Sequence, residues 1–167
     1  MASMKKHPFL QVEYQSTVKL SPADEQKLKL WLSHASQVAE KLASEGLTPK
    51  KITSLKVSLL ICGDTRIKVL NRDHRNKDKV TDVLSFPSNE PFVFGPFLGD
   101  MAICMPQAKR QAKEFKIGIW DEFIHLFFHG LLHLIGYDHE ISLAEEKKMQ
   151  KWEDRALELF SKKRKGA

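Results

Sequence analysis

Hydrophobic and polar residues alternate along this chain with the period of a strand in some places and the period of a helix in others. Residues 10–14 alternate strictly, which predicts a strand with one buried face. A helical period begins after Ser21 and Pro22, a pair that suits the cap and the first turn of a helix. Apolar residues then recur every three or four positions until Gly46, so we expect one long amphipathic helix there.

Later segments repeat the same two patterns. Apolar or β-branched runs bounded by turn residues predict strands at 55–62, 83–86 and 98–104, the last two antiparallel to each other. Helical patterns follow at 106–115, 120–135 and 142–163. Asp64 is expected to cap a short helix, and the polar stretch 71–81 is expected to form a surface loop. These elements predict an α/β (α+β) sandwich, a small mixed sheet of about four strands with several packed helices.

Composition places the chain among globular proteins. Its 167 residues suit one domain spanning 1–167, and 42% hydrophobic with 29% charged residues excludes a disordered or membrane-spanning chain. The sequence has two cysteines and no apolar segment behind its N-terminal lysines. Both features favour a cytoplasmic location, with no secretory signal and no membrane partner.

The net charge is +6 (27 − 21), which suits a polyanionic partner such as nucleic acid. Four of the positive charges fall together near the C-terminus, so we expect a flexible basic tail at 162–167. Charge therefore indicates a kind of partner without locating a site.

Histidines concentrate in segment 120–135 and the turn after it. The segment is apolar nearly all round, so it should be a buried helix. His129 and His133 lie one helical turn apart, a spacing at which two imidazoles can bind one ion at about 2.0–2.1 Å. Gly136 can end the helix, and the chain can then turn back so that His139 supplies a third nitrogen. Three protein ligands with an open fourth position are typical of catalytic zinc.

The sequence leaves open the roles of some residues beside these histidines. His125 cannot share an ion with His133, because eight helical residues span about 12 Å whereas two nitrogens on one ion lie about 3.3 Å apart. It is either a core residue or one that supports a ligand. Asp138 could orient a ligand histidine through its second ring nitrogen, or simply form the turn. Gly130 stands where the His-Glu-x-x-His helix of metalloproteases carries its general base, so that base is missing.

Residues 129–139, with the sequence HGLLHLIGYDH, closely resemble the signature of the YbeY family of bacterial metal-dependent endoribonucleases. Matching stretches are found at 70–87, which contains Arg75 and the run TDVLSFP, and at 98–103, with the sequence LGDMAI. Met149 and Glu153 fall where the family keeps a methionine and a glutamate. The resemblance covers about 55–157, most of the chain.

The resemblance implies a single-strand-specific endoribonuclease that binds zinc, although imidazole ligands also suit nickel. It implies a role in ribosomal RNA processing, at the 3′ end of the small-subunit RNA, and in ribosome quality control. The implied partners are single-stranded ribosomal RNA and the small ribosomal subunit, with no DNA expected. Carried over by position, the metal ligands are His129, His133 and His139, and Arg75 is the essential basic residue. Its guanidinium would hold a phosphate oxygen.

Further basic residues near these motifs could follow the RNA backbone, as in single-strand channels. They are Arg72, Lys77, Lys79, Lys109, Arg110 and Lys113. Each could equally belong to an ordinary solvated face. Phe92, Phe94 and Phe97, in a loop rich in proline and glycine, could stack on bases or rim a partner interface.

Two other functions are compatible with a histidine helix of this kind. One is a metal-dependent protease, which the absence of a glutamate at Gly130 and the basic charge disfavour. The other is a ribosome-assembly factor without catalytic activity, whose metal is structural. A fourth protein ligand would favour that second function, and an open coordination position would disfavour it.

Overall fold

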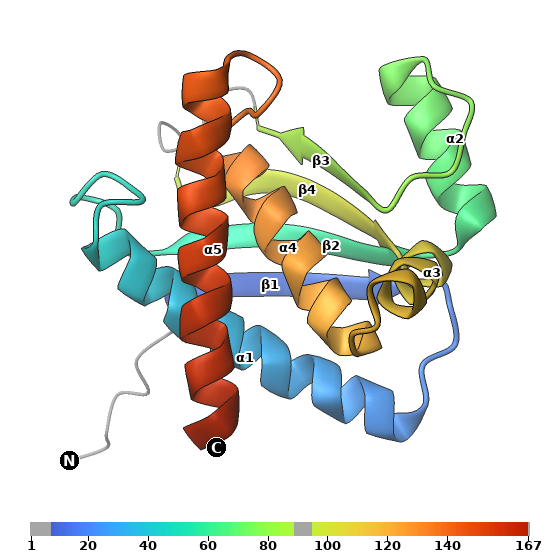
Figure 1. Ribbon diagram of the computed structural model, residues 1–167, viewed down its shortest axis with the longest axis horizontal. Coiled ribbons are helices and arrows are strands. Elements are labelled where there is room, and N and C mark those ends of the chain that lie inside the picture. Colours follow the sequence, from blue (N-terminus) through green and yellow to red (C-terminus); the bar gives the residue numbers. More distant parts are fainter. Residues whose placement is uncertain (1–7, 89–94, 167) are drawn as a thin grey trace.

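The structure, a computed structural model, describes residues 8–88 and 95–166 (Figure 1). Its sheet consists of β1 (Leu10–Ser16), β2 (Leu55–Cys62), β3 (Val83–Pro87) and β4 (Phe97–Cys104). The strand order is β1-β2-β4-β3, in which β1, β2 and β4 run parallel and the edge strand β3 is antiparallel to β4. The predicted mixed sheet of four strands is therefore confirmed, as is the antiparallel pairing of the last two.

Helices cover both faces of this sheet. They are α1 (Pro22–Ser44), α2 (Asp64–Arg75), α3 (Met105–Phe115), α4 (Ile119–Ile135) and α5 (Leu143–Gly166). Figure 1 shows α1, α4 and α5 crossing one face, where they enclose the larger hydrophobic core. On α2, Ile67 belongs to a smaller cluster with Leu84 and Ala102 on the other face. The fold is thus the predicted α/β sandwich. Within the described residues, no helix combines the length and the apolar character needed to cross a membrane.

Local sequence accounts for most of these elements. The Ser21 hydroxyl accepts the Asp24 N–H at 3.1 Å and so caps α1 as predicted. Alternate residues of β2 bury their side chains in the larger core, and most of α4 is buried, in line with its apolar sequence. At the start of α5, the Ser142 hydroxyl accepts the Glu145 N–H at 3.2 Å. The Glu145 carboxylate accepts from the Lys148 ammonium one turn later at 2.7 Å.

The predicted loop at 71–81 is partly wrong, because α2 continues through Arg75. Asn71 is buried, and its side-chain amide donates to the Lys79 carbonyl at 2.9 Å, which ties the following loop back to the helix. Asp64 does not cap α2. It is the first helical residue, Gly63 holds the cap position, and both Asp64 carboxylate oxygens accept from the Arg110 guanidinium.

The C-terminal basic residues also differ from the sequence expectation. A flexible tail was expected at 162–167, whereas residues 162–166 continue α5. Lys162 donates to Glu158 one turn earlier at 2.7 Å, and Arg164 donates to Asp121 of α4. These contacts join the last turns of α5 to its own helix and to a neighbouring one.

Candidate metal centre

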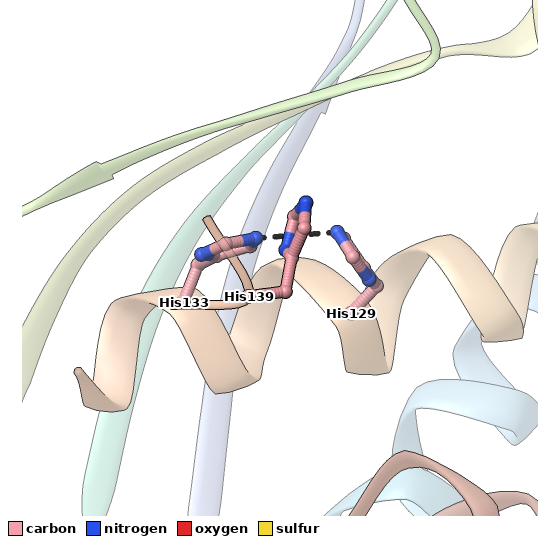
Figure 2. A group of neighbouring side chains, drawn as sticks. All are labelled: His129, His133 and His139. Carbon is pink, nitrogen blue, oxygen red and sulfur yellow. Dashed lines mark hydrogen bonds between the residues drawn. The ribbon is translucent and has the colours of Figure 1, made fainter. Parts of the chain in front are cut away.

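Three imidazole rings lie together above one side of α4 (Figure 2). His129 and His133 occupy successive turns of the helix, and their Nε2 atoms face each other at 3.2 Å. His139, from the segment after α4, places its ring beside both of them. One ring nitrogen from each histidine lies within 4.8 Å of the others, so the group could hold a metal ion.

The turn after α4 brings the third ring to the first two. Gly136 takes a positive φ of 118°, and its N–H reaches the Leu132 and His133 carbonyls, which ends the helix. Asp138 Oδ1 then accepts the Glu140 backbone N–H at 2.8 Å and stabilises the reversal of the chain. This hydrogen bond gives Asp138 the turn role that the sequence left open.

The donor set fits a metal such as zinc. Two nitrogens on one tetrahedral zinc ion lie about 3.3 Å apart, close to the 3.2 Å between the His129 and His133 nitrogens. Burial lowers the pKa of His133, and the charges of His129 and His139 lower it further. A neutral imidazole is the form that binds a metal. Geometry and electrostatics therefore agree on His133 as a neutral nitrogen ligand, with one ring nitrogen of His129 and one of His139 close to it.

Close packing against the sheet fixes the position of α4. The Ser85 hydroxyl of β3 donates to the Gly130 carbonyl at 3.1 Å. A Cβ atom at Gly130 would lie 2.8 Å from the Met101 sulfur and 3.1 Å from the Ser85 hydroxyl oxygen. Position 130 therefore faces the sheet, without space for a glutamate, and the general base of the metalloprotease helix has no counterpart here.

A glutamate on α5 that the motifs did not place in the site supports the histidine group. Glu153 is only 6% exposed. Its Oε2 lies 3.3 Å from His129 Nδ1, and its Oε1 lies 2.5 Å from His125 Nε2. The structure thus places His125 next to a residue that contacts His129, one of the two positions left open for it. The available signal was a glutamate at helical spacing among the buried residues Met149, Ala156 and Phe160.

The paired groups shift each other's pKa. The hydrogen bond to Glu153 raises the pKa of His125 to about 8 against the opposing effect of burial, and the charges of Glu153 and Glu122 add to the rise. For Glu153, burial raises the pKa, but hydrogen bonds and charges from His125 and His129 outweigh it and lower the pKa to about 2. The folded pKa of His125 exceeds the unfolded value of about 6.5. Its stabilisation is therefore complete below about pH 6.5 and is lost as pH rises through about 8.

Replacing His125 with glutamine is accordingly expected to flatten the pH dependence of stability. Urea unfolding in the presence of a chelator should show that wild type loses about 1 kcal/mol more than the variant between about pH 6 and pH 9. The expected difference in the free energy of unfolding is small because the His125 side chain is 39% exposed, so solvent screens its ion pair. Parallel losses in the two proteins would contradict this account.

Arg75 shares one pocket with the three histidines. It lies in the last turn of α2, and its Nη2 is 3.9 Å from Glu140 Oε1. Asp82 also lines this pocket, but both its oxygens are engaged, by the Val83 N–H at 2.7 Å and by the Gln111 amide at 3.0 Å. The fold therefore brings together four of the residues that the family resemblance singled out.

The other predicted RNA contacts do not line this pocket. They are Arg72, Lys77, Lys79, Lys109, Arg110 and Lys113. Arg110 is held by Asp64, and Arg72 bonds Asp73 at 3.0 Å. Phe97 is 42% exposed, while Phe92 and Phe94 lie outside the described residues.

Comparisons with known proteins show the family to which this chain belongs. The sequence model of a family described as Endoribonuclease YbeY matches residues 14–161. The chain belongs to the YbeY family. The YbeY endoribonuclease of Aquifex aeolicus is 42% identical over 123 residues, which cover 74% of this chain and 82% of the relative. The YbeY endoribonuclease of Thermodesulfovibrio yellowstonii is 38% identical over 133 residues, with coverages of 78% and 82%.

A solution structure from Thermotoga maritima has a TM-score of 0.63 and 24% identity to this chain, and it covers 94% of this chain and 92% of its own. At that identity it supports the fold alone. Membership of the YbeY family supports a hydrolase that acts on RNA. The resemblance noted from the sequence is thereby confirmed, and the family match begins further toward the N-terminus than the motifs did.

Proposed function

We propose that the protein is a zinc-dependent, single-strand-specific endoribonuclease that matures the 3′ end of small-subunit ribosomal RNA and acts in ribosome quality control. The small ribosomal subunit is its proposed partner. One observation carries the proposal: the Arg75 guanidinium and three converging histidines line one pocket, although they come from separate segments of the chain. The family match supports the substrate class.

Cleavage of an RNA phosphodiester needs neutralisation of the nonbridging oxygens, an in-line nucleophile and help for the leaving oxygen. His129, His133 and His139 would hold zinc, which when bound supplies a Lewis acid beside the phosphate. Arg75 would donate two parallel N–H groups to a phosphate oxygen pair, for which a guanidinium has the right shape. Its 3.9 Å contact with Glu140 is long, so an incoming phosphate can replace it.

The position of the site within a pocket supports single-strand specificity. Ligands recessed between β3, α4 and the 137–141 segment can be reached by a phosphate on a flexible strand. A stiff duplex presents its phosphates on a broad convex surface and is recognised mainly by shape. A flexible strand can also bend so that the scissile phosphate meets Arg75 and the histidines together.

The proposal is tested by incubating purified protein with labelled single-stranded RNA, a matched duplex and casein, each with and without a chelator. We expect cleavage of single-stranded RNA that is abolished by the chelator and restored by zinc. His133→Ala should abolish it because one ligand is lost, whereas His74→Ala, at an exposed histidine outside the pocket, should not. Casein cleavage, or undiminished cleavage by His133→Ala, would overturn the proposal. Binding to small subunits without any cleavage would instead indicate an assembly factor.

A further inference from the structure

Two buried carboxylates contact His125, and neither lines the pocket of the candidate metal centre. Glu153 of α5 is 6% exposed and Glu122 of α4 is 1% exposed. Removing an ionised carboxylate from water is costly unless it is paired and hydrogen-bonded. Because both carboxylates are nonetheless buried, their partners indicate what they do.

Both carboxylates face the same histidine. His125 Nε2 lies 2.5 Å from Glu153 Oε1, and His125 Nδ1 lies 3.5 Å from Glu122 Oε2. A histidine with a carboxylate at each ring nitrogen can donate from both, so it is held as an imidazolium between them. His125 thereby fixes the rotation of the Glu153 carboxylate and occupies one of its two oxygens.

The second oxygen of Glu153 is directed at a metal ligand. Oε2 lies 3.3 Å from His129 Nδ1, and a carboxylate can only accept at that position. His129 must therefore carry its proton on Nδ1, which leaves Nε2 as an unprotonated nitrogen. That same Nε2 is the atom that faces His133 Nε2 at 3.2 Å.

We propose that Glu153 and His125 are positioning residues for the metal centre: Glu153 fixes the tautomer and the ring orientation of His129, and His125 fixes Glu153. The inference rests on the proposed function only in taking the three histidines as metal ligands. His125 lies outside their pocket and lines a separate depression with Asp121, Leu157 and Arg164. It therefore acts on the metal only through Glu153 and not through contact with substrate.

The test measures zinc affinity directly, by competition with a chromophoric chelator, in variants whose fold is verified by circular dichroism. Glu153→Gln should weaken zinc binding by about 10–100-fold, as is typical when a carboxylate behind a ligand histidine is lost. A glutamine that still accepts from one histidine presents an N–H to the other, where an acceptor is needed. His125→Gln should also weaken zinc binding, by a smaller factor. Glu145→Gln, at a half-buried glutamate on the same helix whose carboxylate bonds Lys148, should bind zinc like wild type.

Nitrogen NMR of the histidine side chains supplies a readout that a purely structural role would not change. We expect His129 to be protonated on Nδ1 in wild type and to become a mixture of tautomers in Glu153→Ala. Zinc affinities of Glu153→Gln and His125→Gln within twofold of wild type, together with an unchanged tautomer, would overturn the inference. If wild type bound no zinc, the proposed metal centre would fail, and the tautomer in the metal-free protein would still decide the role of Glu153. If Glu153→Gln did not fold, His125→Gln at its partly exposed position would decide between the outcomes.

Discussion

Replacing Arg75 with alanine is expected to lower the rate of RNA cleavage by about 10²–10³-fold, the effect of removing one donor that stabilises charge in a transition state. Stability and zinc affinity should be unchanged. The Arg75 side chain is 43% exposed and its pairing with Glu140 at 3.9 Å is loose, so the contact contributes about 0–1 kcal/mol to folding. Arg75→Lys should recover only part of the rate, because lysine restores the charge without the two-pronged geometry.

Arg72→Ala provides the matched control for this prediction. Arg72 lies one turn earlier on α2, its guanidinium bonds Asp73, and it does not line the histidine pocket. Single-turnover cleavage of labelled RNA at saturating zinc should therefore distinguish the two variants. Equal losses at both positions, each relieved by lowering the salt concentration, would show that α2 acts as a general cationic surface. In that case Arg75 would have no specific role at the scissile phosphate.

The three histidines could be predicted from the sequence because their geometry is local. His129 and His133 share a helix face at one-turn spacing, and Gly136 ends the helix just before His139. The contributions of Arg75 and Glu153 are not local. Arg75 reaches the pocket from α2 through the order of strands in the sheet, and Glu153 reaches His129 through the packing of α5 on α4. Helical spacing could show that Glu153 is buried, but no periodicity in the sequence shows which residue Arg75 or Glu153 meets, and only the family motif pointed to Arg75.

The elements of the fold also divide into features set by local sequence and features set by contacts between distant segments. Hydrophobic period and turn residues predicted the bounds of β2 and the buried character of α4. The end of α2 was missed because its last turn is entirely polar, so it carries no apolar period, and a buried side-chain amide at Asn71 holds it in place. The insertion of β4 between β2 and β3 depends on long-range pairing, which a one-dimensional pattern does not contain.

The pairing of β4 with β3 leads to a second large predicted effect, a loss of stability when Gly99 of β4 is replaced. Gly99→Ala is expected to lower the free energy of unfolding by about 3 kcal/mol, from backbone strain of about 1–2 kcal/mol added to overpacking of a similar size. Gly99 has a φ of +138°, and a Cβ atom there would lie 2.2 Å from the Phe86 carbonyl oxygen and 3.0 Å from Pro87 Cα. Both neighbours are backbone atoms of β3, so relief requires β3 to move away from β4.

Gly46→Ala separates strain from collision, because Gly46 has a φ of +106° and nothing lies within 4 Å of a Cβ built on it. Urea unfolding should show a cost of about 1 kcal/mol for this variant, from the positive φ alone. A Gly99→Ala variant no less stable than Gly46→Ala would mean that β3 can shift without cost. A shift of β3 would also affect the candidate metal centre, because Ser85 of β3 donates to the carbonyl of Gly130, which lies between His129 and His133 on α4. Displacement of β3 should therefore weaken zinc binding in Gly99→Ala and leave it unchanged in Gly46→Ala, so the two measurements together test whether the sheet edge supports the metal centre.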